Sequence, residues 1–488
     1  MKISSQTGCR ILASFVLVAA CSVAEAAVSV KAGPLVYSAT GSRYYRIGGG
    51  NWDQLRNFAL QLGGDLVTIN DAAENSWINT NFVNGVRKPY IGLTDSASEG
   101  TYVWVDGSTS TYRNWRSGQP GNSNANTDYA HFDGTASGTW QADDPAYTDE
   151  AIVEVSGPLH VPGEFATIEA AFNALGSSAE RRILVAPGTY RLAASISTTD
   201  VELIGSGQGQ TILEGLTDTY SPSMSLWGDS VLRDLTLVGR SLQQSIVNCN
   251  DSSGSLRMVN CEMRSILSPD NGALIEIGNA SLTLENCLVR DSNAAFENSY
   301  GASIHAVNTV FRDLKVLIAS GSGSVPVVLT NCVLTRFSGF TVQGNTSLEL
   351  MNSIVWGSTA PLNNTGLKAS YSILPISVPG PGNSTTNPLF VNAAGNDFRL
   401  LAGSPAIDAG SLPGFLASAP SDLIDAGGNP RFSDVKSVPN KGVGAQAIDI
   451  GAYELQASEC SGDLNGDDMV DDSDFSLFIV QYNELLCP

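Results

Sequence analysis

The chain has 488 residues, with 26 Lys and Arg against 48 Asp and Glu, and a formal net charge of −22 at pH 7. This acidic balance excludes nucleic acid as a partner, since phosphate contacts need clustered Lys and Arg. It suits a protein that meets divalent cations rather than strongly anionic polymers. The length allows roughly two to four domains.

The first segment has the features of an export signal. An apolar run over residues 11–20 follows two basic residues, and residues 24–26 read Ala-Glu-Ala, the small-x-small form of a cleavage site. We expect residues 1–26 to be a signal peptide and the protein to be secreted or held at the cell surface. One alternative stays open, because residues 18–21 resemble a bacterial lipobox that would place a lipid on Cys21.

Residues 34–156 precede any repeat and are rich in Trp, Gly and Asn. Apolar spacing predicts a helix from residue 51 that ends at a Gly-Gly pair, and a second helix from Ala72. Short strands are expected at 90–93 and 102–105. A turn-rich loop and further short strands follow. This order of elements resembles the C-type lectin fold over about 120 residues.

The resemblance implies a sugar site carried by loops. In the family, calcium is held by a Glu-Pro-Asn or Gln-Pro-Asp loop, a downstream Glu and a Trp-Asn-Asp strand, and sugar hydroxyls complete its oxygen shell. This chain departs from that pattern: its loop reads Gln-Pro-Gly over residues 119–121, and Thr127 replaces the Glu. The strand reads Trp-Gln-Ala over residues 140–142. Apolar Ala59 and Val153 also stand where the family has a disulfide.

A shifted oxygen cage is the hypothesis that remains, since Asn122, Asp128, Asp143 and Asp144 lie one or two positions from the family's ligand positions. The tryptophans at 115 and 140 either stack on sugar or pack in the core. The candidate carbohydrate contacts are Gln119, Asn122, Asp128, Trp140 and Asp143.

Five segments of the middle region align without gaps and share one asparagine. It recurs at Asn260, Asn286, Asn308, Asn331 and Asn352. A period near 22 with short alternating strands predicts a right-handed parallel β-helix over residues 160–456. The asparagine column should form a ladder of side-chain amides. The next column should be small and buried, with its cysteines packed as free thiols: Cys261, Cys287, Thr309, Cys332 and Ser353.

The flanks of the repeats resemble pectin-lyase-like β-helix proteins at residues 183–215 and the closing segment of bacterial secreted β-helix proteins at residues 387–454. The resemblance implies a fold more than an activity. Arg264, Arg290 and Arg312 share one repeat position. They form either a row of ion pairs or a strip that contacts carbohydrate or supplies a lyase base. No catalytic residues are assigned.

The C-terminal stretch, residues 459–488, has the spacing of an EF-hand loop and is similar to half of a type I dockerin. Positions 1, 3, 5, 7, 9 and 12 are Asp463, Asn465, Asp467, Met469, Asp471 and Asp474, and Met469 would offer its carbonyl. We expect this loop to bind calcium and to dock onto a cohesin-like or other cell-surface partner. A disulfide between Cys460 and Cys487 would add roughly 3–4 kcal/mol.

Together these features predict a mostly β, multidomain fold: an α+β C-type lectin-like domain, a parallel β-helix and a short loop-helix tail. The preferred hypothesis is a secreted, non-catalytic carbohydrate-binding or adhesion protein with calcium as its cofactor and a glycan as its partner. Two alternatives remain: a polysaccharide lyase or glycoside hydrolase acting on the β-helix, and a structural surface protein with a degenerate lectin-like domain.

Overall fold

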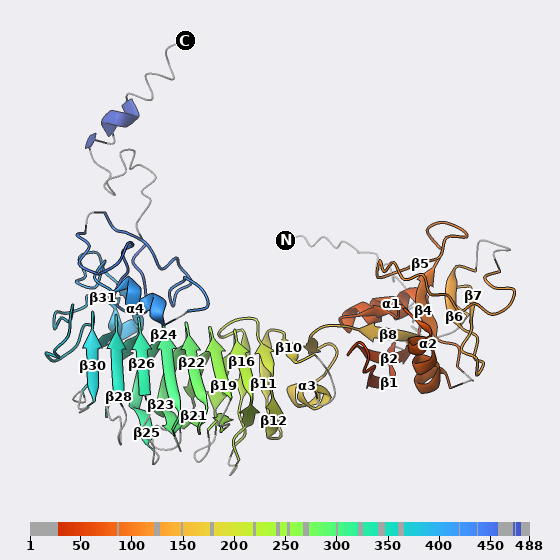
Figure 1. Cartoon of the computed structure of the whole chain (residues 1–488), viewed down its shortest axis with the longest axis horizontal. Coiled ribbons are helices and arrows are strands. Elements are labelled where there is room, and N and C mark those ends of the chain that lie inside the picture. The colour runs from red at the N-terminus through yellow and green to blue at the C-terminus, as the bar shows by residue number, and fades with distance from the viewer. Residues whose placement is uncertain are drawn as a thin grey trace, which may run out of the picture. The chain divides into compact units, whose positions relative to one another are not determined.

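The computed structural model divides the chain into two compact units, the first built mainly from residues up to Glu154 and the second from Val155 onward (Figure 1). Within the described residues, none of the helices has the length and apolar character needed to cross a membrane. The structure describes residues 28–84, 87–121, 127–147, 150–175, 180–217, 221–240, 245–250, 254–266, 273–298, 301–320, 326–339, 347–359, 366–418, 420–436, 438–456, 472–473 and 475–479.

The first unit is built on an eight-stranded sheet with the order β1-β2-β8-β4-β6-β7, in which β3 pairs with β8 and β5 with β4. Most pairings are antiparallel, while β4 and β8 run parallel. The expected strands at 90–93 and 102–105 are present. The bounds are β1 (Ser29–Val36), β2 (Arg43–Gly48), β3 (Asp65–Leu66), β4 (Tyr90–Thr94), β5 (Val103–Trp104), β6 (Tyr129–Phe132), β7 (Trp140–Asp143) and β8 (Glu150–Val155).

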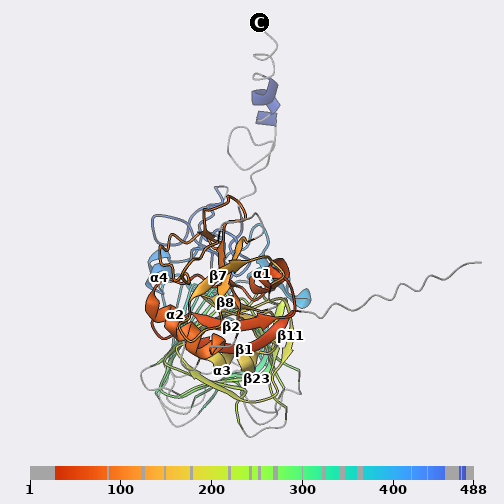
Figure 2. The ribbon, with the colours of Figure 1, turned by 90° about the vertical axis from the view of Figure 1, so that its right-hand side faces the viewer.

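Two helices lie to either side of β2 and β8 (Figure 2). Helix α1 (Trp52–Gln61) buries Trp52, Leu55 and Ala59, which lie on one face at helical spacing. Helix α2 (Ala72–Ile78) is capped by Asp71, whose side chain accepts from the Glu74 amide, and it continues into a π-helical turn, η1 (Asn79–Val83). Both predicted helices are therefore present.

Two apolar side chains pack where C-type lectins have their first disulfide. Ala59 and Val153 are both fully buried. The domain thus relies on burial of apolar side chains at these positions, as the sequence predicts.

The second unit contains a parallel β-solenoid, which confirms the predicted fold class. Its described strands form a ten-stranded and a twelve-stranded sheet, and neighbours in each sheet come from successive turns. The ten-stranded sheet contains β9 (Leu159–Val161), β10 (Arg182–Val185), β13 (Glu202–Ile204), β16 (Asp229–Arg233), β19 (Ser255–Val259), β22 (Ser281–Glu285), β24 (Ser303–Val307), β26 (Pro326–Thr330), β28 (Ser347–Met351) and β30 (Leu367–Ser370).

The twelve-stranded sheet supplies the remaining strands of each turn. Its longest members are β23 and β25. Each is one continuous strand where the earlier turns have two separate strands. The bounds are β11 (Gly188–Arg191), β12 (Ile196–Thr199), β14 (Thr211–Glu214), β15 (Met224–Trp227), β17 (Thr236–Gly239), β18 (Val247–Cys249), β20 (Glu262–Ser265), β21 (Ala273–Ile277), β23 (Leu288–Asn298), β25 (Val310–Ser320), β27 (Val333–Thr335) and β29 (Ile354–Trp356).

Helix α3 (Ile168–Ala174) lies at the first turn of the solenoid. Thr167 caps it, and Ile168, Ala171 and Phe172 are buried in the core cluster that runs along the solenoid. An amphipathic helix at this place covers apolar side chains that have no preceding turn to pack on.

The aligned repeats stack in the predicted register. Leu256 pairs with Leu282, Leu282 with Ile304, and Ile304 with Val327. The five asparagines all adopt left-handed backbone conformations, with φ between 49° and 52°. Asparagine tolerates this region better than most residues do, which explains why one residue type recurs at each bend.

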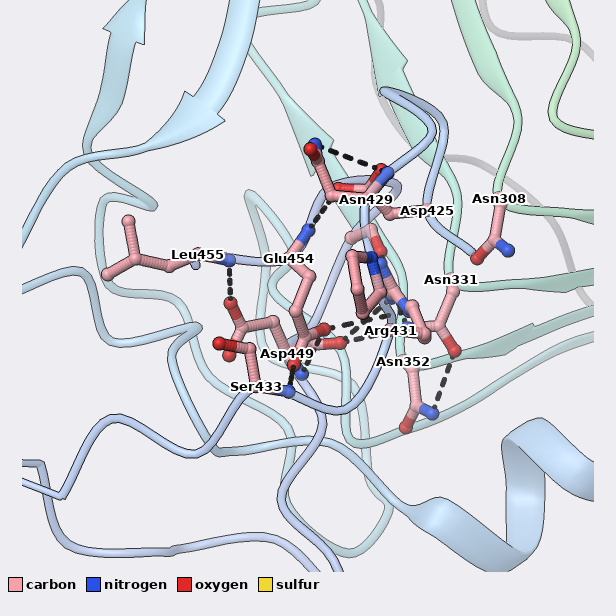
Figure 3. A network of polar contacts seen from close by, with 12 residues as sticks. Asn308, Asn331, Asn352, Asp425, Asn429, Arg431, Ser433, Asp449, Glu454 and Leu455 are labelled. Carbon is pink, nitrogen blue, oxygen red and sulfur yellow. Dashed lines mark hydrogen bonds and ion pairs between the residues drawn. The ribbon is translucent and has the colours of Figure 1, made fainter. Parts of the chain in front are cut away.

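The amide ladder expected of these asparagines is only partly present. Asn352 donates to Asn331 Oδ1 at 3.0 Å, but other amides bond to the C-terminal segment instead (Figure 3). Asn308 donates to the Ile424 carbonyl, Asn331 to the Asp449 carbonyl, and Asn352 also to the Ser411 carbonyl. The segment that follows the last turn supplies unpaired carbonyls along this edge, and the side-chain amides satisfy them.

The column beside the asparagines is buried, as predicted. Its thiols and hydroxyls reach back to carbonyls of the preceding turn: Cys261 contacts the Leu232 carbonyl at 3.4 Å, and Ser353 the Leu329 carbonyl at 3.1 Å. Cys332 is a free thiol, and burial raises its pKa to about 12. It is therefore a packing residue rather than a reactive thiol.

The closing segment contains β31 (Phe390–Asn392), the short 3-10 helix η3 (Ala393–Gly395), β32 (Asp397–Leu400) and α4 (Leu412–Ala417). Its centre is a buried polar network around Arg431, which is fully buried and donates to the carbonyls of Asp449 and Gly451 (Figure 3). Glu454 lies 3.7 Å from the same guanidinium. Burial raises the pKa of Asp449 to about 7.

Candidate carbohydrate- and calcium-binding site

The predicted loop is held against β7 by backbone bonds. The Trp140 amide donates to the Asn114 carbonyl at 2.9 Å, and the Arg116 amide donates to the Trp140 carbonyl at 2.8 Å. Strands β6 and β7 pair antiparallel, so that Tyr129 lies opposite Asp143. The peptide bond between Gln119 and Pro120 is cis. The structure thus brings Gln119, Asp128 and Asp143 onto neighbouring chain segments, while Asn122 lies outside the described residues.

Gln119 uses its side-chain oxygen inside the protein. Its Oε1 accepts from the Gly121 amide at 3.1 Å and from the Ala142 amide at 3.2 Å. A carbonyl oxygen has two lone pairs, and both are taken by these donors. Gln119 therefore ties the loop to β7, and its amide nitrogen is the group left to meet a sugar hydroxyl.

Trp140 lies in the core of the first unit. It is fully buried, its Nε1 donates to Asn75 Oδ1 at 2.8 Å, and its ring packs edge-on against Trp104, Tyr112 and Trp115. A ring without exposed surface cannot stack on a sugar. The structure removes Trp140 from the sugar-contacting candidates and assigns it the other role that the sequence left open.

Asp143 belongs to a small polar cluster with Gln141 and His131. Its Oδ2 accepts from Gln141 Nε2 at 3.1 Å and lies 3.3 Å from His131 Nε2. The His131 Nδ1 is 2.6 Å from the Phe132 carbonyl, so the neutral ring carries its proton there. Burial lowers the pKa of His131. One carboxylate oxygen of Asp143 is thus engaged, and its side chain is 30% exposed.

Asp128 lies next to a residue that sequence analysis missed. The Asp95 amide donates to the Asp128 carbonyl at 3.1 Å, and burial together with Asp95 raises the pKa of the Asp128 carboxyl. Asp95 is 2% exposed, and its Oδ2 accepts from the Gly100 amide at 2.9 Å. Its Oδ1 is buried and accepts no well-aligned hydrogen bond from the described residues, and the nearby Tyr102 hydroxyl, which interacts with this carboxylate, donates to the Thr127 carbonyl at 2.7 Å. An aspartate directly after the strand at 90–93 was the signal available for it.

These contacts indicate where calcium fits. At Gln119 and Asp143 the oxygens are largely occupied by protein donors, so this part of the loop is a poor cage. At Asp95 and Asp128 the two carboxylates repel each other, since burial and Asp95 together raise the pKa of Asp128, and the buried Asp95 Oδ1 lacks a well-aligned donor, which a cation would satisfy. Within the described part of the chain no three His, Cys, Asp or Glu side chains gather closely enough to hold a metal. Backbone and water oxygens would have to complete the shell.

The C-terminal calcium loop and its disulfide cannot be compared with the structure, because Asp463, Asn465, Asp467, Met469, Asp471, Asp474, Cys460 and Cys487 lie outside the described residues. The same holds for residues 1–26 and for Cys21. Residues 475–479 are helical, as expected after the loop, and Phe475 and Phe478 are exposed there.

The arginine column of the solenoid stacks as predicted, with Arg264 opposite Arg290 and Arg290 opposite Arg312. Its members pair with carboxylates of the same and neighbouring turns. Arg290 contacts Glu262 and Asp291, and Arg312 contacts Asp313. These carboxylates balance the arginine charges, so the column is a row of ion pairs.

The comparisons with known proteins match the first unit. A family model for the lectin C-type domain covers residues 49–152. A perlucin-like protein from Mytilus galloprovincialis is 37% identical over 122 residues, which are 24% of this chain and 77% of that protein. C-type lectin domain family 4 member M from Nomascus concolor is 36% identical over 88 residues, 17% of this chain and 22% of that protein.

A solved structure of the human scavenger receptor C-type lectin carbohydrate-recognition domain matches with 29% identity and a TM-score of 0.21, covering 24% of this chain and 91% of that chain. The order of helices and strands, the loop held against β7 and the relative from Mytilus galloprovincialis agree on one assignment. Through residues 49–152, the chain belongs to the family of proteins that carry a C-type lectin domain.

Proposed function

We propose that the protein is a non-catalytic glycan-binding protein whose lectin domain contacts the sugar. Membership of the C-type lectin domain family supports carbohydrate binding as the general function. The surface we assign to the sugar is formed by the loop from Gln119 to Gly121 and by Asp143 at the end of β7, and Asn122, which lies outside the described residues, stays a candidate contact. The Gln119 amide nitrogen donates and the free oxygen of Asp143 accepts, a combination that suits sugar hydroxyls.

The observation that carries the proposal is that the buried Oδ1 of Asp95, beside Asp128, lacks a well-aligned donor. A buried carboxylate oxygen is rarely left without a donor, because its lost hydration costs on the order of 1–3 kcal/mol. Asp95 and Asp128 would hold calcium. The ion would neutralise both carboxylates and fix the chain that leads into β6.

The experiment is retention of the full chain on a panel of immobilised polysaccharides, with calcium and with chelator, while polymer length is followed. We expect calcium-dependent retention without cleavage. Asp95→Asn should lose the calcium dependence, whereas Asp53→Asn, which changes an exposed aspartate of the same domain, should keep it. Cleavage would transfer the function to the solenoid. No retention in either condition would contradict glycan binding.

We further propose that the solenoid, residues 160–456, is a spacer for the lectin domain of residues 34–156, and that residues 459–488 form a calcium-binding docking tail. The EF-hand spacing from Asp463 to Asp474 and the exposed Phe475 and Phe478 support the tail's role. Export through residues 1–26 would place the protein outside the cell or at its surface. A truncation after residue 458 should lose one high-affinity calcium per chain and keep glycan retention.

A further inference from the structure

A groove of about 360 Å³ lies beside β5, and Tyr102 is the lining residue that also interacts with the Asp95 carboxylate. One wall is the hydroxyl-rich segment from Ser108 to Thr111. The other walls are Tyr102, Val103, Trp104 and Arg113. The Asp106 carboxylate accepts from the Ser108 amide, and Ser108 Oγ accepts from the Ser110 amide, so the hydroxyl segment is held in a fixed turn.

Arg113 is the one cationic side chain that lines this groove. Its Nη1 donates to the carbonyls of Ser110 and Tyr112, at 3.0 and 2.7 Å, and its Nη2 donates to the Tyr102 carbonyl at 3.2 Å. The guanidinium carbon lies 5.3 Å from the centre of the Trp104 ring. Three carbonyls and one ring therefore fix its orientation before any ligand arrives.

This arrangement leaves one edge of the guanidinium available. Nη1 has two hydrogens and two acceptors, while Nη2 has two hydrogens and one acceptor. Nε takes part in none of the bonds formed among the described residues. One hydrogen of Nη2 and the hydrogen of Nε are the pair that binds two oxygens of one carboxylate or sulfate.

Arg113 lacks the charge pairing that three other arginines of the domain have. Arg46 and Arg87 both contact Glu150, and Arg56 contacts Asp65. Arg113 forms no ion pair with the described acidic residues, and burial is the cause that lowers its pKa. In a chain of net charge −22, a half-buried cation without a carboxylate is an uncommon arrangement, and an anionic ligand would complete it.

We propose that this groove binds a saccharide through one carboxylate or sulfate group, which Arg113 holds with Nε and Nη2 while Thr109 and Thr111 meet the sugar hydroxyls. The inference deepens the proposed glycan-binding function and rests on it. Both threonines are exposed at the rim, and Val103, 48% exposed, offers an apolar surface to the sugar ring. The acidic chain disfavours a long polyanion, so the ligand is a glycan with isolated anionic groups.

The test is calorimetric titration of the full chain, in chelator, with four probes: a neutral disaccharide, its uronate counterpart, its sulfated counterpart and inorganic sulfate. We expect the uronate or the sulfated disaccharide to bind at least about tenfold more tightly than the neutral one, as a charge-assisted bidentate contact requires. The preference should shrink as salt rises from about 0.05 to 0.5 M.

Variants at the rim keep the test independent of folding. Thr111→Glu places a carboxylate at the mouth of the groove and should reduce binding of the anionic probe about tenfold, whereas Thr111→Gln, which has the same size without the charge, should reduce binding of neutral and anionic probes alike and keep the preference for the anionic one. Arg113→Gln should abolish the preference. Lys31→Gln removes the same charge from an exposed strand residue outside the groove and should change nothing.

Equal binding of neutral and anionic disaccharides, or binding that Thr111→Glu leaves unchanged, would overturn the inference. Inorganic sulfate binding as tightly as the saccharides would replace the saccharide assignment with a free-anion site. Calcium-dependent retention of neutral glycan alongside either result would leave the proposed function intact. Failure of all glycans in both tests would remove the proposed function as well.

Discussion

The lectin domain and the solenoid satisfy their buried polar groups in opposite ways. In the lectin domain each contact is used once and joins distant parts of the chain, as when Trp140 donates to Asn75 or Gln119 accepts from Ala142. In the solenoid one backbone conformation recurs from turn to turn, and the left-handed asparagines at five successive turns are its clearest case. The repeated sequence pattern therefore predicts the fold of the solenoid, whereas the polar contacts of the lectin domain depend on individual residues.

The largest expected effect is that of a substitution at Trp140, which should destabilise the lectin domain and leave the solenoid unchanged. Replacing it by alanine removes a fully buried ring and a buried hydrogen bond, and should destabilise the lectin domain by about 3–5 kcal/mol. The lectin transition in a calorimetric scan should then move to lower temperature, with the solenoid transition unchanged. Trp227→Ala, at a 41% exposed solenoid position, is the control and should shift neither transition by much. An unchanged lectin transition in Trp140→Ala would refute its core role.

The corresponding change in the solenoid is Asn331→Ala. Asn331 has a φ of 51° and donates to the carbonyls of Asp449 and Gly451. Alanine would strain the backbone and leave those carbonyls with fewer donors, at a cost of roughly 2–4 kcal/mol. Asn331→Gly keeps the conformation and should cost less. If the glycine variant is equally unstable, the amide and not the backbone explains the recurring asparagine.

A substitution in the closing segment should stabilise the protein. Asp408 is 1% exposed and has a φ of 51°, and its buried carboxylate oxygens accept no well-aligned hydrogen bond and interact weakly with the Val435 amide. Asparagine suits that backbone and carries no charge, so Asp408→Asn should raise the free energy of unfolding of the solenoid unit at pH 8 by about 1–2 kcal/mol. Asp425→Asn is the matched control, because Asp425 accepts from the amides of Gly427, Asn429 and Glu454. It should be destabilising.

The last prediction concerns the pH responses of the two units, which should have opposite signs. Burial lowers the pKa of His131, so the lectin domain should lose stability as the pH falls below the ordinary range of histidine. Burial raises the pKa of Asp408 to about 6 and that of Asp449 to about 7. The stability that these carboxyls contribute is present at acid pH and is lost as the pH rises through those values. Denaturant titrations at pH 5 and pH 8 would measure both slopes, and slopes of one sign would contradict this assignment.

The sequence predicted much of the solenoid because each turn repeats the same solution. The asparagines from 260 to 352, the buried small column and the arginine stack all occupy the predicted positions. The sequence did not predict the network around Arg431, because its hydrogen-bond partners lie about twenty residues away and no sequence repeat connects them. The prediction of an asparagine ladder was only partly correct for the same reason, because the C-terminal segment that accepts from these amides has no repeat.

The lectin domain shows the converse. Its element order was readable from helix and strand signals, but the use of each polar side chain was not. Gln119 was identified as a site residue, yet its oxygen bonds to the backbone, and Trp140 lies in the core. Asp95, whose buried oxygen suggests a calcium site, lies in a turn whose sequence does not distinguish it from a structural aspartate. Burial and pairing, which decide these roles, arise only when distant segments meet.

The most direct test of the central claim is the affinity of the full chain for its best-retained glycan, measured with calcium and with chelator for the unaltered protein and for Asp95→Asn. The account predicts that chelator and the substitution each weaken binding, and that chelator adds nothing once Asp95 is replaced, because both act at one calcium. Binding that survives both changes would contradict calcium-dependent recognition through the lectin domain.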